Sequence, residues 1–89
     1  MRLDLFLKAS RLCLRRSIGQ KICEAGLVSV NGQGAKSSHS VKPDDEIALR
    51  IRNRQLTIRV AKLPATRSVA KSDAASLYEV IADQVLDES

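Results

Sequence analysis

The feature that most limits how this chain can fold is a pair of short helix patterns placed directly before a tight turn, within residues 2–36. Leu3, Phe6 and Leu7 have the spacing of one face of a helix. This spacing predicts a first helix over residues 1–10 with a buried side. We expect the three side chains to belong to the core, because the chain has one Phe and no Trp to fill it.

A second helix is predicted to begin at Ser17 and to end at Gly26. Ser17 and Gln20 have the capping-box spacing, in which the two side chains bond to backbone N–H groups of the first helical turn. Glycine is the commonest residue just past the end of a helix. The apolar residues at helical spacing, which we expect to form the buried face, are Ile18, Ile22 and Ala25.

The joint between the two predicted helices is basic. Arg15 and Arg16 stand just before the expected start of the second helix, where unpaired N–H groups and the positive end of the helix dipole favour an anion. Two guanidinium groups at such a place predict a phosphate-binding site, with a solvated charge pair as the alternative. Leu12 and Leu14 are expected to close the joint from beneath.

Downstream of Gly26, the sequence predicts two β-hairpins. Asn31-Gly32 between β-branched residues is typical of a type I′ turn, because both central residues of that turn need a positive φ. Residues 47–51 and 55–61 alternate between apolar and polar side chains, which predicts an antiparallel pair with one buried face. A weak turn signal at residues 53–54 separates the two strands.

The end of the chain is predicted to hold a linker and one short helix. Residues 63–68 contain a Pro and small polar residues and are expected to be the linker. Ser72-Asp73 is a candidate helix start, and the apolar stripe behind it consists of Leu77, Val80 and Ile81. We therefore divide the chain into a domain over residues 1–63 and an appended linker and helix over residues 64–89. The helix is expected to dock on the domain, and a partner-binding tail is the alternative.

Charge is distributed unevenly along the chain. Residues 1–67 carry 14 basic and 5 acidic groups, net +9, whereas residues 68–89 carry 1 basic and 5 acidic groups, net −4. A body of +9 favours a polyanionic partner, and nucleic acid is the commonest one. A basic surface that serves only solubility is the alternative that charge alone leaves open.

Several other classes of site are disfavoured. Charges interrupt every early apolar run, so we expect neither a signal peptide nor a membrane span. Cys13 and Cys23 are too few and too isolated for a disulfide framework or a zinc site, and we interpret both as small buried residues. We expect a cytoplasmic protein with no metal and no cofactor.

Several spaced motifs resemble the S4 RNA-binding domain, in register over about two-thirds of the chain, residues 1–61. The resemblance implies an α+β fold, a small S4-type (αL-like) domain with two helices packed on a small antiparallel sheet, to which a short C-terminal helix is added. In size the chain resembles the small stand-alone bacterial S4 proteins of ribosome-associated quality control, relatives of the heat-shock S4 protein. One departure is Asp44, where the family usually has Gly in a turn. The matching motifs are Met1-Arg2-Leu3-Asp4, Phe6-Leu7-Lys8-Ala9-Ser10-Arg11-Leu12, Arg15-Arg16-Ser17, Gly26-Leu27-Val28-Ser29-Val30-Asn31-Gly32, Lys36-Ser37-Ser38 and Val41-Lys42-Pro43.

The resemblance also implies an RNA-facing surface formed by the first two helices and the following hairpin. Arginine side chains there would grip phosphate oxygens, and small polar residues would let the backbone approach closely. With one Tyr and one Phe in the chain, base stacking is a minor mode, and we expect folded RNA to be recognised by its shape and backbone. The matching positions are Arg2, Lys8, Ser10, Arg11, Arg15, Arg16, Ser17, Gln20, Lys21, Asn31, Gly32, Lys36, Ser37 and Lys42.

The function that the resemblance implies is non-catalytic. It is the binding of ribosomal RNA and tRNA on the large ribosomal subunit, by a monomer, during tail elongation or rescue of stalled nascent chains. The alternative is an accessory RNA-binding subunit of an RNA-modifying enzyme, since S4 domains also precede such catalytic domains. Against catalysis by the chain itself, the sequence has no nucleophile–base set and no cofactor-binding loop.

Four other charged positions and one histidine have simpler interpretations. Asp4 at a helix start is interpreted as the partner of a nearby Arg rather than as a catalytic acid. His39 stands alone in a polar loop, and we assign it no role. Arg50, Arg52 and Arg59 either extend the basic surface or keep a strand face soluble, and the sequence favours neither.

Overall fold

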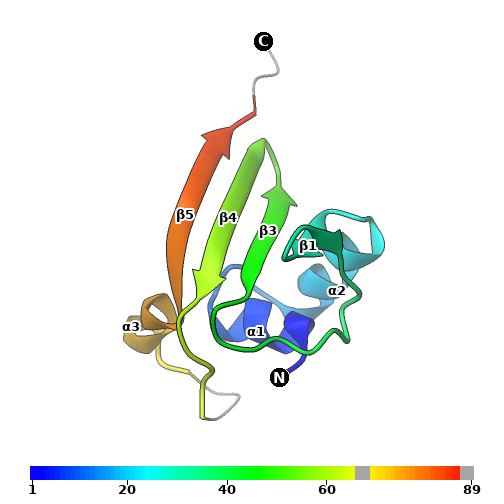
Figure 1. Ribbon diagram of the computed structural model, residues 1–89. Helices are drawn as coiled ribbons and strands as arrows, with labels where there is room; N and C mark the ends of the chain where they lie inside the picture. The colour runs from blue at the N-terminus through cyan, green and yellow to red at the C-terminus, as the bar shows by residue number, and fades with distance from the viewer. Residues whose placement is uncertain (66–68, 87–89) are drawn as a thin grey trace.

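The computed structural model describes residues 1–65 and 69–86. Its elements, in chain order, are α1 (Leu3–Ala9), α2 (Arg16–Glu24), β1 (Val28–Val30), β2 (Gln33–Gly34), β3 (Glu46–Ile51), β4 (Arg54–Val60), α3 (Lys71–Ala74), a single 3₁₀ turn (Ala75–Leu77) and β5 (Tyr78–Val85). The strands form one antiparallel sheet in the order β2-β1-β3-β4-β5. In Figure 1, α1 and α2 lie together at one end of the sheet, and α3 lies beside the start of β5.

The core lies between α1 and the apolar side of the β3–β4 hairpin. Leu3, Phe6 and Leu7 are fully buried on α1, as their spacing predicted. The antiparallel pairing of β3 with β4 is also confirmed, and it sets the inward side chains opposite one another. Those buried on the sheet side are Ile47, Leu49, Ile58 and Val60. The predicted α+β architecture is therefore confirmed, and the core is small and mainly aliphatic.

Helix α2 differs from its prediction at its start and on its buried face. It begins at Arg16, with Arg15 as the N-cap residue and no side-chain cap, so the predicted capping box is wrong. The buried residues of α2 are Gly19 and Cys23, while Ile18 is 38% exposed. Gly19 allows α2 to lie close against α1. A Cβ at this position would already lie 3.5 Å from a methyl of Leu7 and 3.7 Å from the backbone of α1.

The end of α2 agrees with its prediction. Gly26 has φ +77°, its N–H donates to the carbonyl of Cys23, and the N–H of Leu27 donates to that of Ile22. This pair of bonds is the Schellman motif, which satisfies the last carbonyls of a helix and favours glycine at the left-handed position.

The α1–α2 joint places its leucines differently from the prediction. Leu14 is 82% exposed and does not close the joint, whereas Leu12 is half-buried and packs against the core. Cys13 is the buried residue of the joint, with its N–H donating to the carbonyl of Leu7 at 3.0 Å. Burial raises the pKa of the Cys13 thiol to about 11 and also raises that of Cys23, so both free cysteines behave as the small apolar residues that we predicted.

Both predicted hairpin turns occur, one of them shifted. Asn31 and Gly32 have φ +53° and +85° and join β1 to β2, as a type I′ turn requires. The β3–β4 turn lies at residues 52–53, one residue earlier than predicted, because Ile51 pairs with Arg54.

The turn before β3 holds a non-glycine residue in the left-handed region. Asp44 has φ +74°, and the N–H of Asp45 donates to the carbonyl of Lys42 across the turn at 3.2 Å. The buried Asp45 carboxylate in turn accepts the N–H of Lys42 at 3.1 Å. The turn thus keeps the geometry of a glycine turn with aspartate in the glycine position, which is a mildly strained arrangement.

The C-terminal helix is much shorter than predicted, and the assignment of Val80 and Ile81 to it was wrong. Helix α3 ends at Ala74, and residues 78–85 form β5, which pairs antiparallel with β4 and sets Val80 opposite Ile58. A lone short helix is marginal, whereas β5 satisfies the otherwise unpaired backbone groups along the outer edge of β4. The segment still docks as expected, through the buried Leu77. Part of the predicted linker, residues 66–68, lies outside the described residues.

In the described part of the chain, no helix has both the length and the apolar character that crossing a membrane needs.

Candidate nucleic-acid interface

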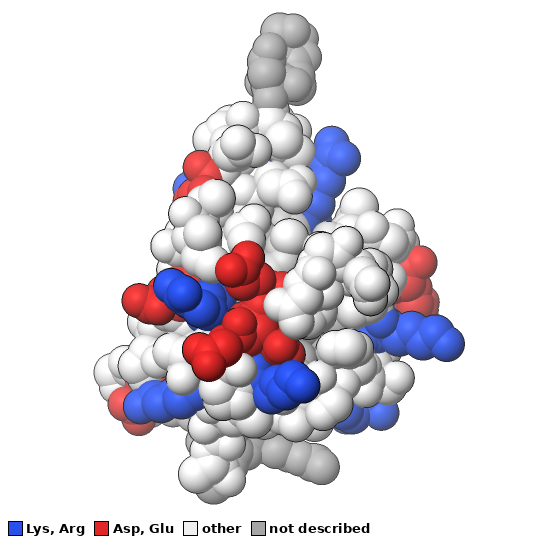
Figure 2. Space-filling model, viewed as in Figure 1, with Lys and Arg blue, Asp and Glu red and all other residues white. Residues whose placement is uncertain are grey.

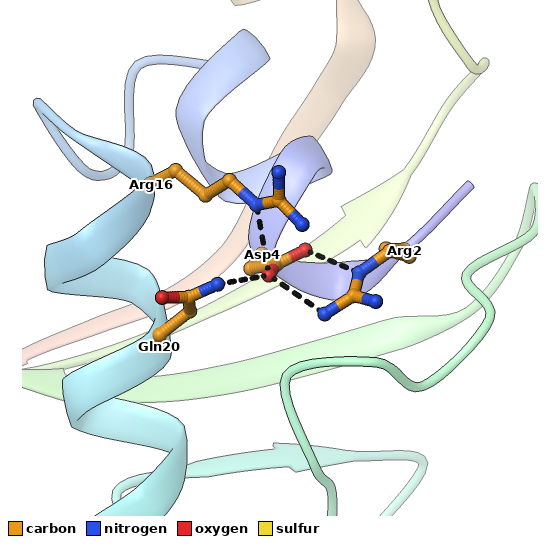
Figure 3. Close-up of polar contacts among 4 residues, drawn as sticks. All are labelled: Arg2, Asp4, Arg16 and Gln20. Carbon is orange, nitrogen blue, oxygen red and sulfur yellow. Dashed lines mark hydrogen bonds and ion pairs between the residues drawn. The ribbon is translucent and has the colours of Figure 1, made fainter.

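The most organised polar feature of the molecule is a carboxylate, Asp4, surrounded by three donor side chains (Figure 3). Asp4 is fully buried. Arg2 donates from Nε to Oδ1 and from Nη2 to Oδ2, both at 3.2 Å. Oδ2 also accepts from Nε of Arg16 at 3.1 Å and from Nε2 of Gln20 at 3.0 Å. Four hydrogen bonds are about what one carboxylate can accept, so the group is saturated by protein donors.

Three segments of the chain meet to build this cluster. Arg2 is the N-cap of α1 and Asp4 lies in its first turn. Arg16 is the first residue of α2, and Gln20 lies one turn later on the same side of that helix. The loop over residues 37–40 fixes the start of α1, because the N–H groups of Leu3 and Asp4 donate to carbonyls of this loop at 2.8 and 3.1 Å.

The electrostatics of the cluster keep Asp4 ionised. Burial alone would raise the pKa of this carboxyl, but the hydrogen bonds from Arg2, Gln20 and Arg16 outweigh it and lower the pKa to about 2. One negative charge therefore stands between two positive charges at neutral pH. The sequence-based interpretation of Asp4 as the partner of a nearby Arg is confirmed, and its partners are two arginines.

The guanidinium groups of Arg2 and Arg16 each bond to the buried Asp4 on one side and are exposed to solvent on the other. The side chains of Arg2 and Arg16 are 44% and 40% exposed, while that of Asp4 is 0% exposed. Each guanidinium has five N–H donors; Arg2 uses two of them on Asp4 and Arg16 uses one. Within residues 1–65 and 69–86, the other donors have no protein acceptor. The arrangement can present two oriented forks to an anion without first ordering the side chains.

Most of the other predicted contact residues lie exposed on the same helices and the adjoining loops. Arg11 is exposed with φ +63°, and its Nη2 donates to the carbonyl of Val69 at 3.4 Å. Exposed positions also include Lys8, Arg15, Ser17, Lys21, Gly32, Lys36 and Lys42.

Three predicted residues have mainly structural contacts. Ser10 is 2% exposed, and its hydroxyl donates to the carbonyl of Leu7 at 3.2 Å. The amide of Asn31 donates to Asp45 at 3.1 Å and accepts the N–H of Glu46 at 3.0 Å, which ties the hairpin to β3. Ser37 is half-buried and supplies the carbonyl that accepts the N–H of Asp4.

The arginines of β4 belong to a different surface. Arg54 forms a two-bond pair with Asp83 of β5 at 2.8 and 3.0 Å, and Arg59 lies 3.4 Å from Glu79 of the same strand. Figure 2 shows the face on which β3, β4 and β5 lie in front: acidic side chains gather at its centre, with Lys and Arg side chains spaced around them. The positive charges of Arg54 and Arg59 on β4 are therefore balanced by the carboxylates of Asp83 and Glu79 on β5.

Sequence reasoning missed two members of the polar framework. Gln20 was assigned to a helix cap and to the RNA-facing surface but not to a contact with Asp4, although its four-residue spacing from Arg16 places both on one side of α2. That spacing, together with an Asp at the start of α1 that was already expected to pair with an arginine, was a signal for the cluster. Asp45, which joins the Lys42 turn to Asn31, gave no comparable local signal.

Comparison with known proteins agrees with this geometry. A family model described as the S4 domain matches residues 1–47. The chain is 40% identical over 88 residues to the RQC P-site tRNA stabilizing factor of Bacillus subtilis, covering 99% of this chain and 100% of the relative. It is 37% identical to the protein of that name from Streptococcus pneumoniae, covering 100% and 99%.

Among solved structures, the trimeric structure of Vibrio cholerae heat shock protein 15 matches with a TM-score of 0.84 at 36% identity, covering 92% of this chain and 82% of that one. A hypothetical protein solved in solution matches with a TM-score of 0.79 at 30% identity, covering 92% and 98%. The motifs over residues 1–47, the two-helix geometry and these relatives agree, and the chain belongs to the S4 domain family.

Proposed function

We propose that this chain is a non-catalytic RNA-binding protein that acts in ribosome-associated quality control, on the large ribosomal subunit. The observation that carries the proposal is the Asp4 cluster, in which one buried carboxylate orients two half-exposed arginines on the α1–α2 surface. Guanidinium forks held in this way match phosphate oxygens. The names of the full-length relatives, RQC P-site tRNA stabilizing factors, support tRNA in the P site as one of the RNAs contacted.

The proposed setting is the cytoplasm, where a single copy of the chain contacts ribosomal RNA and tRNA while a stalled nascent chain is elongated or rescued. The contact surface consists of the exposed members of the predicted set. Ser10 is left out of it because its side chain is buried, and Asn31 acts by fixing the hairpin. Gln20 and Ser37 are left out because both are half-buried and bond to Asp4. The proposed contacts are Arg2, Lys8, Arg11, Arg15, Arg16, Ser17, Lys21, Gly32, Lys36 and Lys42.

The absence of catalysis is part of the proposal, and the chemistry of the thiols supports it. Cys13 and Cys23 are buried and their pKa values are raised by that burial, so neither supplies a thiolate nucleophile at neutral pH. Asp4 has a pKa of about 2 and accepts four hydrogen bonds. It therefore serves poorly as a general acid or base near neutral pH.

We further propose that residues 1–63 carry the RNA contacts and that residues 64–89 form an addition to that domain. The acidic residues of β5 face Arg54 and Arg59, and their negative charge suits a contact with phosphate poorly. The described part of the addition contributes to the core through Leu77 and to the sheet through β5. Its role is therefore stability rather than recognition.

The dependence of binding on salt tests the proposed function. If about five phosphates are engaged, the logarithm of the association constant for large ribosomal subunits carrying a P-site tRNA should fall with the logarithm of salt concentration, with a slope of about −3.5 to −4.5. An association constant unchanged from low to moderate salt would contradict phosphate binding, and failure of the wild-type protein to bind these subunits would contradict the function itself.

A further inference from the structure

We infer that Leu14, the exposed leucine of the α1–α2 joint, is an apolar RNA contact that packs on the ribose or base of a nucleotide whose phosphates the neighbouring arginines hold. This inference rests on the proposed function and adds to it a contact that does not depend on charge. The observation behind it is the exposure of Leu14, 82%, at a position where the sequence predicts burial.

The local geometry explains why Leu14 is left without a partner in the protein. With Arg15 as the N-cap of α2, Leu14 occupies the position before the cap. An apolar residue there commonly packs against the fourth residue of the helix, an arrangement called the hydrophobic staple. In this chain the fourth residue is Gly19, which has no side chain to offer and lies against α1. The close packing of the two helices therefore removes the staple partner of Leu14.

The surroundings of Leu14 determine what kind of partner fits. Leu14 is one residue from Arg15 and two from Arg16, so its Cα lies within roughly 7 Å of the Cα of Arg16. Arg11 and Arg15 are also exposed in the same joint. The nearest carboxylates along the chain are ten residues away: Asp4, which is buried and bonded to the two arginines, and Glu24, at the far end of α2. An exposed apolar side chain flanked along the chain by arginines suits an anionic partner that also has apolar surface. Among macromolecules, RNA supplies both in each nucleotide, as phosphate beside the faces of sugar and base.

A second exposed apolar residue stands four positions further along the chain. Ile18 lies in the first turn of α2 and is 38% exposed, although it was expected to be buried. Val85, which is 74% exposed on β5, shows that exposure by itself is not diagnostic. What distinguishes Leu14 and Ile18 is their place beside Arg15 and Arg16. Val85 lies on the strand that carries Glu79 and Asp83, and this makes it a matched control.

The experiment measures binding of the full-length protein to large ribosomal subunits carrying a P-site tRNA. Leu14→Ser should lower the affinity about five- to tenfold, because the apolar area covered on binding is lost. Leu14→Met should stay within about twofold of the wild type, since it keeps that area, and Val85→Ser should do the same. Because these side chains are exposed, all three variants are expected to melt within a few degrees of the wild type.

The effect should also differ in kind from that of an arginine. The ratio of wild-type to Leu14→Ser affinity should stay constant as salt rises, whereas the ratio for Arg16→Ala should shrink, because only the latter removes a phosphate contact. A diazirine amino acid at position 14 should cross-link to RNA on irradiation.

Three results would overturn the inference: wild-type affinity of Leu14→Ser, an equal loss in Leu14→Met, or a cross-link to ribosomal protein alone. Any of these, combined with normal binding by the wild type and a defect in Arg16→Ala, would leave the proposed function standing. Failure of the wild type to bind would remove the proposed function instead.

Discussion

The Asp4 cluster and the Arg54–Asp83 pair show how little a distance alone says about an ion pair. Arg54 and Asp83 have the shorter contacts, 2.8 and 3.0 Å, against 3.1–3.2 Å for the two arginines of the cluster. The carboxylate of Asp83, however, is 35% exposed, whereas that of Asp4 is 0% exposed. Water can replace the partner of Asp83, but not the partners of Asp4.

This difference assigns different roles to the two regions. The exposed pair on β4 and β5 balances charge at the edge of the sheet. In the cluster, the buried carboxylate fixes Arg2 at the start of α1 and Arg16 at the start of α2, so folding of α1 against α2 and orientation of the two guanidiniums become one event. Our account is that recognition depends on this fixed geometry rather than on the number of positive charges.

The largest expected effect is on stability. Asp4→Ala should lower the free energy of unfolding by about 2–4 kcal/mol, because it removes the acceptor of four hydrogen bonds in a buried place. Asp83→Ala should lower it by at most about 1 kcal/mol, as for other exposed pairs. Urea unfolding of the two variants and the wild type measures both, and equal losses would contradict the distinction drawn between the regions.

The next effect is on binding. Arg16→Ala should cost about 1.5–3 kcal/mol in affinity for large ribosomal subunits, roughly tenfold or more, since a charge-assisted contact is lost at an oriented site. Arg59→Ala, whose side chain faces Glu79 at 3.4 Å, should cost about 0–1 kcal/mol. Circular dichroism checks that both variants are folded. Similar losses would mean that the whole basic surface contributes diffusely.

The third effect is a dependence of stability on pH. The pKa of Asp4 is about 2 in the folded protein against an ordinary value of 3.8. The lowered pKa means that this group stabilises the fold above about pH 4 and that the contribution is lost as pH falls towards 2. At 1.36 kcal/mol per pKa unit, it amounts to about 2 kcal/mol.

The difference in unfolding free energy between the wild type and Asp4→Asn should therefore shrink by about that amount from pH 5 to pH 2. Val85→Ser, which removes no titratable group, serves as the control, and its difference from the wild type should stay constant. A difference for Asp4→Asn that is constant over this range would contradict the coupling of Asp4 ionisation to folding.

The sequence was sufficient to predict those features that depend on residues close together in the chain. The Asn31-Gly32 turn, the buried stripe Leu3, Phe6 and Leu7, and the Gly26 helix end depend on residues within one turn of each other, and all three occur as predicted. The pairing of Asp4 with arginine was also predictable, because a carboxylate in a first helical turn and nearby cations attract each other.

Most of the predictions that were wrong involve contacts between segments distant in the chain. Gln20 was assigned to its own helix end but donates to Asp4, which is 16 residues away. Val80 and Ile81 fit a helical spacing as well as a strand, and pairing with β4 decides the matter. Leu14 was expected to be buried because it is apolar, yet the position that would cover it is Gly19. The position of Val80 and Ile81 could not be read within their own segment, whereas the relation of Leu14 to Gly19, five residues further on, is local.

The most direct test of the central claim is the affinity of Asp4→Asn for large ribosomal subunits carrying a P-site tRNA, compared with that of Asp83→Asn. Each change raises the net charge from +5 to +6, so a purely Coulombic surface would bind more tightly in both cases. If the buried carboxylate orients Arg2 and Arg16, Asp4→Asn should instead bind about three- to tenfold more weakly at a temperature where it is folded, while Asp83→Asn binds as well as the wild type or slightly better. Binding by folded Asp4→Asn that equals or exceeds that of Asp83→Asn would contradict the account.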